Sequence, residues 1–221
     1  RTRAVERGLV ADDADLTVVM GVNHDWYDPD EHRIISNASC TTNCLSPVAK
    51  VLDEEFGIET GFLTTTHGVT SSQAVVDRPI KKRRRGRSAL TSIIPTTTGA
   101  AVATTIVLPQ LEGKMDGMAM RVPVISGSVI DFVARLEKPV SVASINETFK
   151  RRANSDELEG ILGYTEDEIV SADIIGKPWS SLFDAKSTMV LQDNTAKVIS
   201  WYDNEWGYSA RVVDLTELVA G

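Results

Sequence analysis

The chain has 221 residues, of which 42% are hydrophobic and 24% are charged, and its formal net charge is −8. This length holds one large domain or two modest ones, and the apolar content is sufficient for a real core. The negative charge disfavours non-specific binding to nucleic acid or to an anionic membrane. No apolar run approaches the roughly 20 residues that a membrane-spanning helix needs.

The cysteines and the N-terminal residues indicate the compartment. Four of the first seven residues are charged, and no apolar core of a secretory signal follows them. Cys40 and Cys44 lie four residues apart, which is not the pattern of a disulfide framework. We therefore expect a reducing, cytoplasmic location and neither a membrane nor a nucleic-acid partner.

The first third of the chain predicts short elements that lead to a helix. Residues 1–15 are polar and predict a helix or an irregular end. A short strand, a polar loop and a second short strand follow, over residues 16–22, 23–33 and 34–35. His24 and His32 lie in the polar loop, and we expect both to be solvated.

A helix-start signal follows the second strand. Ser36, Asn37 and Ser39 are residues whose side-chain oxygens cap the free N–H groups of a helix's first turn. Behind them, apolar residues recur at helical spacing until Gly57 ends the run. This segment therefore predicts an amphipathic helix with a defined start.

Cys40 falls in or just before the first turn of that helix. The free N–H groups and the helix dipole favour an anion there, so we expect the thiol to ionise below its free pKa of about 8.5. Such a thiol would act as a nucleophile. A buried and inert cysteine is the alternative.

A strand is predicted over residues 62–67 and ends in His67. A cysteine that opens one helix and a histidine that ends the next strand can meet at one edge of a sheet. A Cys/His pair is the usual way to activate a thiolate. A histidine with a purely structural role is the alternative.

Residues 81–108 carry two features that can bind anions. Six lysines and arginines lie within residues 81–87 with no aromatic residue among them, and nucleic-acid platforms usually need stacking aromatics. We therefore expect a solvated or subunit-contact loop there. Hydroxyls and a glycine at residues 96–99 then lead into a helix predicted over residues 101–108, and such a turn can hold a phosphate.

The rest of the chain predicts a sheet with further helices. Strands of an antiparallel sheet are predicted over residues 118–123 and 128–136, and Arg121 in the first is suited to an anion partner. The remaining predicted elements, in order, are a helix over 141–152, short elements at 161–164 and 169–170, strands over 188–191 and 196–201, a polar-aromatic turn at 202–209 and a helix over 210–219.

Together these motifs resemble phosphorylating glyceraldehyde-3-phosphate dehydrogenase. Ser-Asn-Ala-Ser-Cys-Thr-Thr-Asn-Cys at residues 36–44 looks like the family's active-site signature. Six further motifs match in order: Thr-Thr-Thr-His at 64–67, Ser-Ile-Ile-Pro at 92–95, Thr-Gly-Ala-Ala at 98–101, Gly-Met-Ala-Met-Arg-Val-Pro at 117–123, Gly-Ile-Leu-Gly-Tyr at 160–164 and Trp-Tyr-Asp-Asn-Glu at 201–205. The resemblance covers residues 17–221 in one register.

The resemblance implies an α+β fold with a mixed or antiparallel sheet and helices on one face. It divides the chain into a remnant of a Rossmann-type cofactor domain at 1–39, a catalytic domain at 40–205 and a C-terminal helix at 206–221 that would pack on the cofactor domain. The Gly-x-Gly-x-x-Gly fingerprint of dinucleotide binding is absent from this sequence. We therefore expect most of the cofactor half to be lacking and turnover by this chain alone to be weak or absent.

The resemblance also implies roles for ten residues. Cys40 would attack the aldehyde of glyceraldehyde 3-phosphate, and His67 would activate the thiol and carry the proton. The other eight would bind ligands: Thr70 and Arg121 the substrate's phosphate; Ser39, Thr41, Thr98 and Gly99 the attacking inorganic phosphate; Asn204 and Tyr208 the nicotinamide.

The activity implied is the oxidation and phosphorylation of glyceraldehyde 3-phosphate to 1,3-bisphosphoglycerate through a cysteine thioester, in a glycolytic homotetramer. The cofactor implied is NAD, with NADP also open, and we expect no metal site. Alternatives are the related erythrose-4-phosphate dehydrogenase and a domain without dehydrogenase activity. Nucleic-acid binding through residues 81–87 is a distant third.

Overall fold

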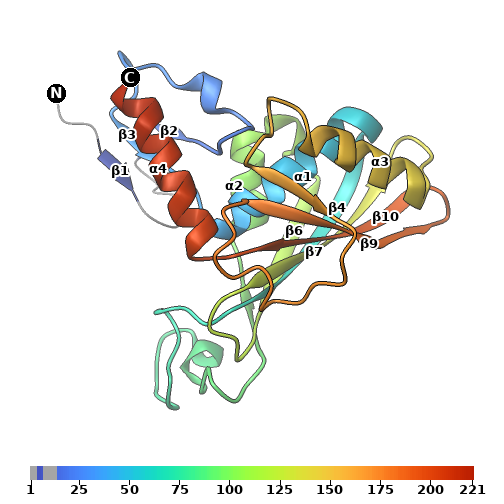
Figure 1. Cartoon of the computed structure of the whole chain (residues 1–221). Helices are drawn as coiled ribbons and strands as arrows, with labels where there is room; N and C mark the ends of the chain where they lie inside the picture. Colours follow the sequence, from blue (N-terminus) through green and yellow to red (C-terminus); the bar gives the residue numbers. More distant parts are fainter. Residues whose placement is uncertain (1–3, 7–13) are drawn as a thin grey trace.

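Two β-sheets, one large and one small, organise the described part of the chain (Figure 1). The structure is a computed structural model, and it describes residues 4–6 and 14–221. The strand order is β1-β3-β2 in the small sheet and β5-β6-β4-β7-β10-β9-β8 in the large one. The strands are β1 (Ala4–Glu6), β2 (Leu16–Thr17), β3 (Ile34–Ser36), β4 (Ile58–His67), β5 (Ile94–Thr97), β6 (Met115–Arg121), β7 (Ser128–Leu136), β8 (Leu162–Thr165), β9 (Ser181–Leu191) and β10 (Thr195–Tyr202).

Three α-helices cover one face of the large sheet, and a fourth packs against the small sheet (Figure 1); the count refers to the residues that the structure describes. The helices are α1 (Cys40–Phe56), α2 (Ala100–Val107), α3 (Val142–Ala153) and, on the small sheet, α4 (Trp206–Ala220). Short 3₁₀ turns are η1 (His24–Trp26), η2 (Arg83–Gly86) and η3 (Pro109–Leu111). In the described ranges no helix combines the length and the apolar character needed to cross a membrane.

The predicted α+β class is confirmed, and the large sheet is mixed. β6 pairs in parallel with β4, and β8 pairs in parallel with β9, whereas the other neighbours are antiparallel. β5 was not predicted because Pro95 lies in it, and proline is unusual in strands. β5 is an edge strand, where a missing N–H is tolerated.

The strand predicted over residues 16–22 is wrong beyond Thr17, because β2 spans only Leu16–Thr17. Val19 is fully buried but is not in a strand. The side chain of Asn23 replaces a strand partner: its Oδ1 accepts from the Val19 N–H at 2.9 Å, and its Nδ2 donates to the Thr17 carbonyl at 2.9 Å. A side chain that satisfies the backbone in this way ends the strand in a turn.

Two expectations for the N-terminal residues are also wrong. A helix or an irregular end was expected over residues 1–15, but residues 4–6 form β1, which pairs in parallel with β3; residues 1–3 and 7–13 lie outside the described residues. His24 and His32 are half-buried rather than solvated. Each ring accepts a backbone N–H at Nδ1, from Gly21 at 3.2 Å and from Asp28 at 2.9 Å.

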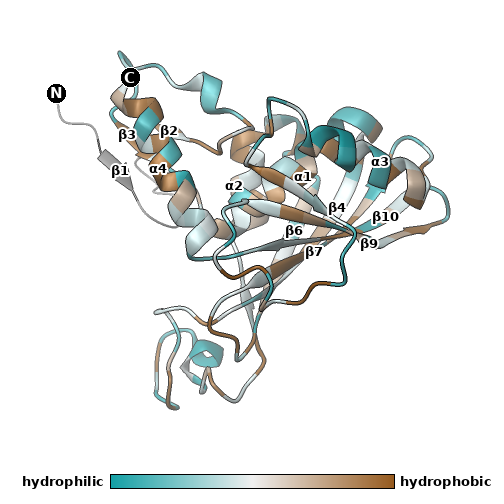
Figure 2. Cartoon of the chain, in the orientation of Figure 1, coloured by the Kyte–Doolittle hydropathy of each residue, from teal (hydrophilic) through white to brown (hydrophobic). Residues whose placement is uncertain are grey.

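The main core lies between the large sheet and its three helices. Phe149 of α3 and Phe183 of β9 are fully buried, and their rings stack with centroids 3.9 Å apart and planes at 10°. A second cluster joins α4 to the small sheet through Val18, Ile35 and Leu215. Figure 2 shows both apolar and polar segments along α4, as expected of a helix with one face packed.

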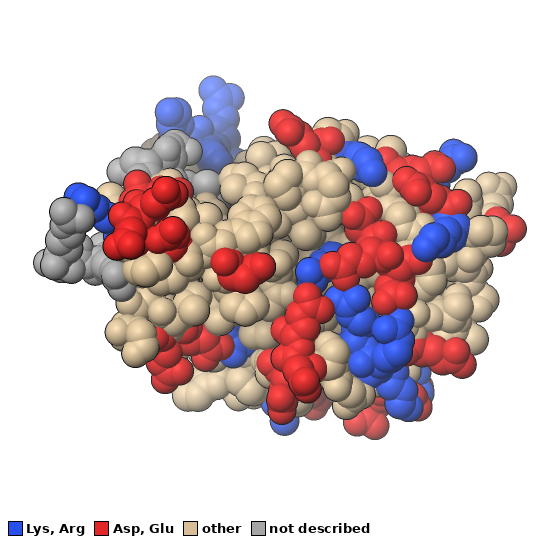
Figure 3. Space-filling view, turned by 90° about the horizontal axis from the view of Figure 1, so that it is seen from above, with Lys and Arg blue, Asp and Glu red and all other residues tan. Residues whose placement is uncertain are grey.

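Ion pairs connect the outer surfaces of α1 and α3. Arg152 contacts Glu54 at 2.7 Å and Glu157 at 2.9 Å, and Lys50 contacts the same two carboxylates at 2.8 and 3.1 Å. Figure 3, which looks onto the helix-covered side, shows acidic and basic side chains next to one another. These pairs connect the C-terminal half of α1 to the end of α3 and to Glu157.

We predict that Phe149→Ala lowers the free energy of unfolding by about 3–5 kcal/mol, because the change removes a stacked ring from a closed core. Urea unfolding measures this. The control is Val170→Ala, whose side chain is 58% exposed and whose loss should cost within about 0.5 kcal/mol. Equal losses for the two variants would contradict this description of the core.

Candidate active site

The start of α1 and the end of β4 bring Cys40 and His67 together. Cys40 is the first residue of α1, His67 is the last residue of β4, and the Sγ and Nε2 atoms lie 3.4 Å apart. Ser39 is the N-cap of α1, since its Oγ accepts from the Thr42 N–H at 3.1 Å. The helix ends at Gly57, which has a φ of 72°. The predicted helix start therefore aims the thiol at the imidazole.

The turn before Cys40 is strained. Ala38 has a φ of 54°, a left-handed conformation that costs a residue with a side chain about 1 kcal/mol. Its surroundings hold it there: the side chain is fully buried, the N–H donates to Ser36 Oγ at 3.2 Å and the carbonyl accepts from Tyr208 at 3.4 Å. This turn lets the chain leave β3 and immediately enter α1.

A buried tyrosine connects the elements that carry the two reactive side chains. The hydroxyl of Tyr202 lies 2.8 Å from Thr41 Oγ1 on α1 and 2.9 Å from Thr65 Oγ1 on β4. Its ring meets the His67 ring edge-on with centroids 5.9 Å apart. These contacts fix the orientation of the imidazole relative to the first turn of α1.

The electrostatics of the thiol differ from the expectation. Burial raises the pKa of Cys40 to about 11, against the opposing effects of hydrogen bonds from Thr41 and of the Arg121 charge. This direction is opposite to the expected lowering, because desolvation of the thiol outweighs its hydrogen bonds and the Arg121 charge. Burial, reinforced by the Arg121 charge, lowers the pKa of His67 to about 4. At neutral pH the pair is a thiol beside a neutral imidazole.

The pair lies in a cavity of about 410 Å³. Nine of the ten residues singled out from the sequence line it: Ser39, Cys40, Thr41, His67, Thr70, Thr98, Gly99, Arg121 and Asn204. Tyr208 is not among the lining residues and contacts the strained turn instead. Hydroxyls and cations predominate around the thiol, which is the donor set that an oxyanion such as phosphate needs.

The basic run contributes a residue that sequence reasoning missed. The run was expected to form a solvated or subunit-contact loop, but Arg85 is half-buried and lines the cavity, with Nε 2.9 Å from Thr96 Oγ1 and Nη1 3.3 Å from Ser72 Oγ. The neighbouring Gly86 is buried, and a Cβ there would lie 2.3 Å from the Arg78 carbonyl. Gly86 was the only sequence signal that the loop folds tightly, because a run of equal charges does not reveal which of its side chains line the cavity.

Asn204 is held at the cavity by neighbouring side chains. Its Oδ1 accepts from Ser128 Oγ at 2.7 Å, and Ser128 Oγ accepts from the Gly68 N–H at 3.1 Å. Its Nδ2 donates to Glu205 Oε1 at 3.3 Å. The oxygen of the amide is therefore occupied, and the nitrogen has only one long bond, so the group can donate to a ligand's carbonyl.

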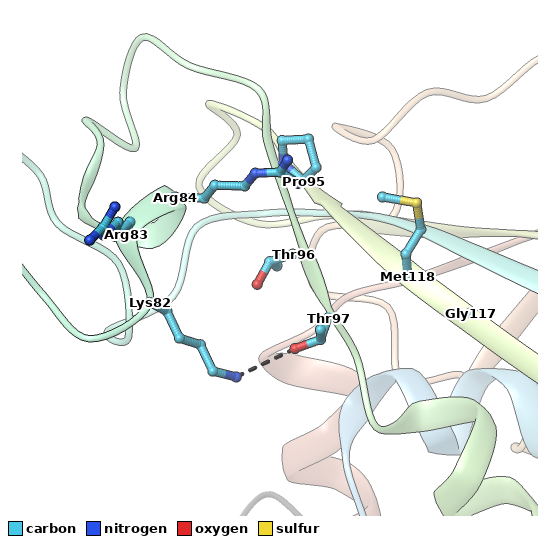
Figure 4. Close-up of a pocket in the computed structure, with 8 residues that line it drawn as sticks. All are labelled: Lys82, Arg83, Arg84, Pro95, Thr96, Thr97, Gly117 and Met118. Carbon is cyan, nitrogen blue, oxygen red and sulfur yellow. Dashed lines mark hydrogen bonds between the residues drawn. The ribbon is translucent and has the colours of Figure 1, made fainter.

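A second cavity of about 470 Å³ lies beside the first, at the edge of the large sheet. Figure 4 shows Lys82 extending toward Thr97 of β5, where Nζ and Oγ1 are 3.4 Å apart. Lys82 and Thr97 line both cavities. The eight residues around this second cavity include no thiol, imidazole or carboxylate.

Comparison with known proteins agrees with this geometry. Residues 39–204 match the family model described as glyceraldehyde 3-phosphate dehydrogenase, C-terminal domain. The chain belongs to the glyceraldehyde-3-phosphate dehydrogenase family. It is 57% identical over 209 residues to glyceraldehyde-3-phosphate dehydrogenase of Streptomyces coelicolor and 57% identical over 210 residues to that of Geobacillus stearothermophilus. Each alignment covers 95% of this chain, and the chain spans 62% of the length of each relative.

We predict that iodoacetamide at neutral pH labels Cys40 and leaves Cys44 unlabelled in the folded protein. Cys40 lines the cavity, whereas Cys44 is fully buried, with Sγ 3.4 Å from Ser181 Oγ. Peptide mass spectrometry of the wild type and of the Cys40→Ser and Cys44→Ser variants measures this. Cys40→Ser should abolish labelling, and Cys44→Ser should retain it. Equal labelling of both cysteines would contradict the assigned positions.

We predict that the lowered pKa of His67 makes the folded protein less stable in mild acid than at neutral pH. Because its folded pKa of about 4 lies below the ordinary 6.5, the unfolded chain takes up the proton first. The contribution of neutral His67 to the free energy of unfolding is complete above pH 6.5. It is lost as the pH falls toward 4, which lowers that free energy by up to about 3 kcal/mol. Urea unfolding across this range should show a smaller acid loss in His67→Asn, with His32→Asn as the control. An unchanged loss in His67→Asn would refute the assignment.

Proposed function

We propose that the chain provides the active site of a phosphorylating glyceraldehyde-3-phosphate dehydrogenase. The reaction is the oxidation of glyceraldehyde 3-phosphate and the transfer of the acyl group to inorganic phosphate, which gives 1,3-bisphosphoglycerate in glycolysis. The observation that carries the proposal is the 3.4 Å contact between Cys40 Sγ and His67 Nε2 inside a cavity lined by hydroxyls and cations.

In this proposal Cys40 is the nucleophile and His67 is the general base. Sγ forms a bond to the aldehyde carbon, the thiol proton passes to Nε2, and the carbonyl π electrons move to oxygen. The backbone N–H of Cys40, in the first turn of α1, stabilises that oxyanion. Oxidation of the adduct leaves a thioester on Cys40, which inorganic phosphate attacks at the carbonyl carbon to release the acyl phosphate.

Two groups of residues bind the two phosphates in this proposal. Thr70 and Arg121 hold the phosphate of the substrate; Thr70 Oγ1 lies 3.4 Å from Arg121 Nη1, so both groups face the same volume. The attacking phosphate is held by Ser39, Thr41, Thr98 and Gly99. Support comes from the position of this second group at the starts of α1 and α2, where free N–H groups favour an anion.

The cofactor in this proposal is NAD, which supplies the hydride acceptor when bound; NADP would supply the same chemistry. Two residues of this chain are suited to hold the nicotinamide group of the cofactor. Asn204 would hold the carboxamide, because its oxygen is taken by Ser128 and its nitrogen remains available to donate. Tyr208 on α4 would flank the ring.

We further propose that the protein assembles as a homotetramer through the face of the large sheet that the helices leave open. Phe62, Val133 and Met189 lie in one register row across β4, β7, β10 and β9, and Phe62 and Met189 are 70% and 60% exposed. The β10 member of the row is Lys197, and a second copy of the chain would cover the three apolar side chains. The chemistry needs Cys40 as a free thiol, which the reducing cytoplasm maintains.

The proposal predicts an acyl transfer that needs no cofactor. With 1,3-bisphosphoglycerate, Cys40 Sγ should attack the acyl carbon and release inorganic phosphate, leaving 3-phosphoglycerate as a thioester on Cys40. Mass spectrometry of the intact protein and its peptides measures the adduct. His67→Asn should slow its formation roughly a hundredfold, and Cys40→Ser should abolish it. A folded wild-type protein that forms no adduct, or an adduct on Cys44, would refute the proposed function.

A further inference from the structure

Asp203 is a buried carboxylate that lies between β10 and α4, next to two residues that line the active-site cavity. It is 3% exposed, and its oxygens accept four hydrogen bonds. Oδ1 accepts from Ser126 Oγ at 2.8 Å, from the Glu205 N–H at 2.9 Å and from the Trp206 N–H at 3.0 Å. Oδ2 accepts from the Gly176 N–H at 2.8 Å. One side chain therefore joins three segments that lie apart in the sequence.

Hydrogen bonds alone compensate the charge of this carboxylate. Among the residues that the structure describes, no cationic side chain forms an ion pair with Asp203. Burial by itself would raise the pKa of the carboxyl, but the donors from Gly176, Trp206, Glu205 and Ser126 lower it overall. A buried charge of this kind is tolerated only where its donors are in place, so it selects one arrangement of the three segments.

The same bonds fix the turn that carries Asn204. Asn204 and Glu205 follow Asp203 directly, and both line the cavity. Because the N–H groups of Glu205 and Trp206 bond to Asp203 Oδ1, the backbone around Asn204 is closed into a tight turn. The Asn204 amide can then reach Ser128, whose Oγ donates to its Oδ1 at 2.7 Å. The amide nitrogen is thereby left for a ligand, with one 3.3 Å bond to Glu205.

The two remaining donors come from loops that pack against each other. Ser126 lies in the loop between β6 and β7, and Gly176 lies in the connection between β8 and β9. Gly127, with a φ of 91°, brings these loops together, since a Cβ there would collide with the Ser171 carbonyl oxygen. Because Asp203 bonds to both loops, the position of the turn depends on this packed pair and not only on α4.

Capping of α4 does not account for all four bonds. An aspartate just before a helix commonly accepts from its first free N–H groups, and the bonds from Glu205 and Trp206 serve that purpose. The bonds from Ser126 and Gly176 do not involve the helix. A serine would suffice as a cap, whereas accepting from all four donors requires two acceptor oxygens and no donor, which is a carboxylate.

We propose that Asp203 is a positioning residue that orients the Asn204 amide toward the ligand in the cavity. The ligand is a ring that carries a carboxamide, because Asn204 presents an N–H donor that suits a carbonyl oxygen. Asp203 does not touch the ligand and acts through the turn. The proposal rests on the proposed function, which assigns the nicotinamide group to Asn204.

Nitrogen relaxation NMR of the Asn204 side chain tests the proposal on the intact chain. In the wild type, the order parameter of the Asn204 NH₂ group should approach the rigid value of about 0.85. In Asp203→Asn it should fall below about 0.6, because the new NH₂ group faces a backbone N–H whichever way the amide turns. Asn204→Asp identifies the resonance. A mobile Asn204 in the wild type would overturn the proposal.

Two further variants separate positioning from capping and from a general loss of charge. Asp203→Ser keeps a cap for α4 but cannot accept from both loops, so the Asn204 order parameter should fall as in Asp203→Asn. It also carries the test if Asp203→Asn does not fold. Asp173→Asn removes a carboxylate that accepts the Val170 N–H at 2.8 Å in the connection between β8 and β9, and it should change nothing. A wild-type order parameter in a folded Asp203 variant, or an equal fall in Asp173→Asn, would overturn the proposal.

The probe for the ligand is nicotinamide mononucleotide, and ribose 5-phosphate, which lacks the ring, is its control. Only the first should shift the Asn204 NH₂ resonances of the wild type. Asp203→Asn should weaken this binding at least about fivefold, as expected for the loss of one oriented hydrogen bond. Equal affinities would overturn the proposal. An ordered wild-type Asn204 that does not respond to the probe would refute the nicotinamide assignment and leave the positioning by Asp203 standing.

Discussion

The contact between Cys40 Sγ and His67 Nε2 is the interaction on which the site depends. It exists because a helix begins and a strand ends at neighbouring points of one sheet edge, with Tyr202 bonded to both elements. Burial disfavours the charged form of each group, which raises the pKa of the Cys40 thiol and lowers the pKa of the His67 imidazole. In the proposed mechanism the thiol proton passes from Cys40 to His67, and the 3.4 Å separation of Sγ and Nε2 makes that transfer short.

The cations of the cavity come from two different kinds of structure. Arg121 is fixed by the register of β6 against β4, directly opposite His67. Arg85 comes from a long connection, and it reaches the cavity because Gly86 lets that connection fold tightly on itself. One arginine therefore contacts the imidazole directly, whereas the other adds positive charge to the cavity without touching the ring. This difference makes the two positions a natural pair for comparison.

Local sequence patterns predicted α1 and both reactive side chains, because capping by Ser39, the stop at Gly57 and apolar spacing act within a few residues. They did not predict the Asn23 turn or the inward position of Arg85, which depend on contacts formed only in the fold. The pKa of the Cys40 thiol was predicted to be lowered, whereas burial raises it, and the reason for the difference is similar. A helix terminus is visible in a sequence, but the depth at which a side chain is buried is not.

The most direct test of this account is the rate at which iodoacetamide alkylates Cys40 at neutral pH in the wild type and in His67→Asn. If burial keeps the thiol protonated and His67 removes the proton, the substitution should slow alkylation at least about tenfold while the fold is unchanged. Equal rates in the two proteins would mean that the first turn of α1 ionises the thiol by itself. That result would contradict the central role assigned to the cysteine–histidine contact.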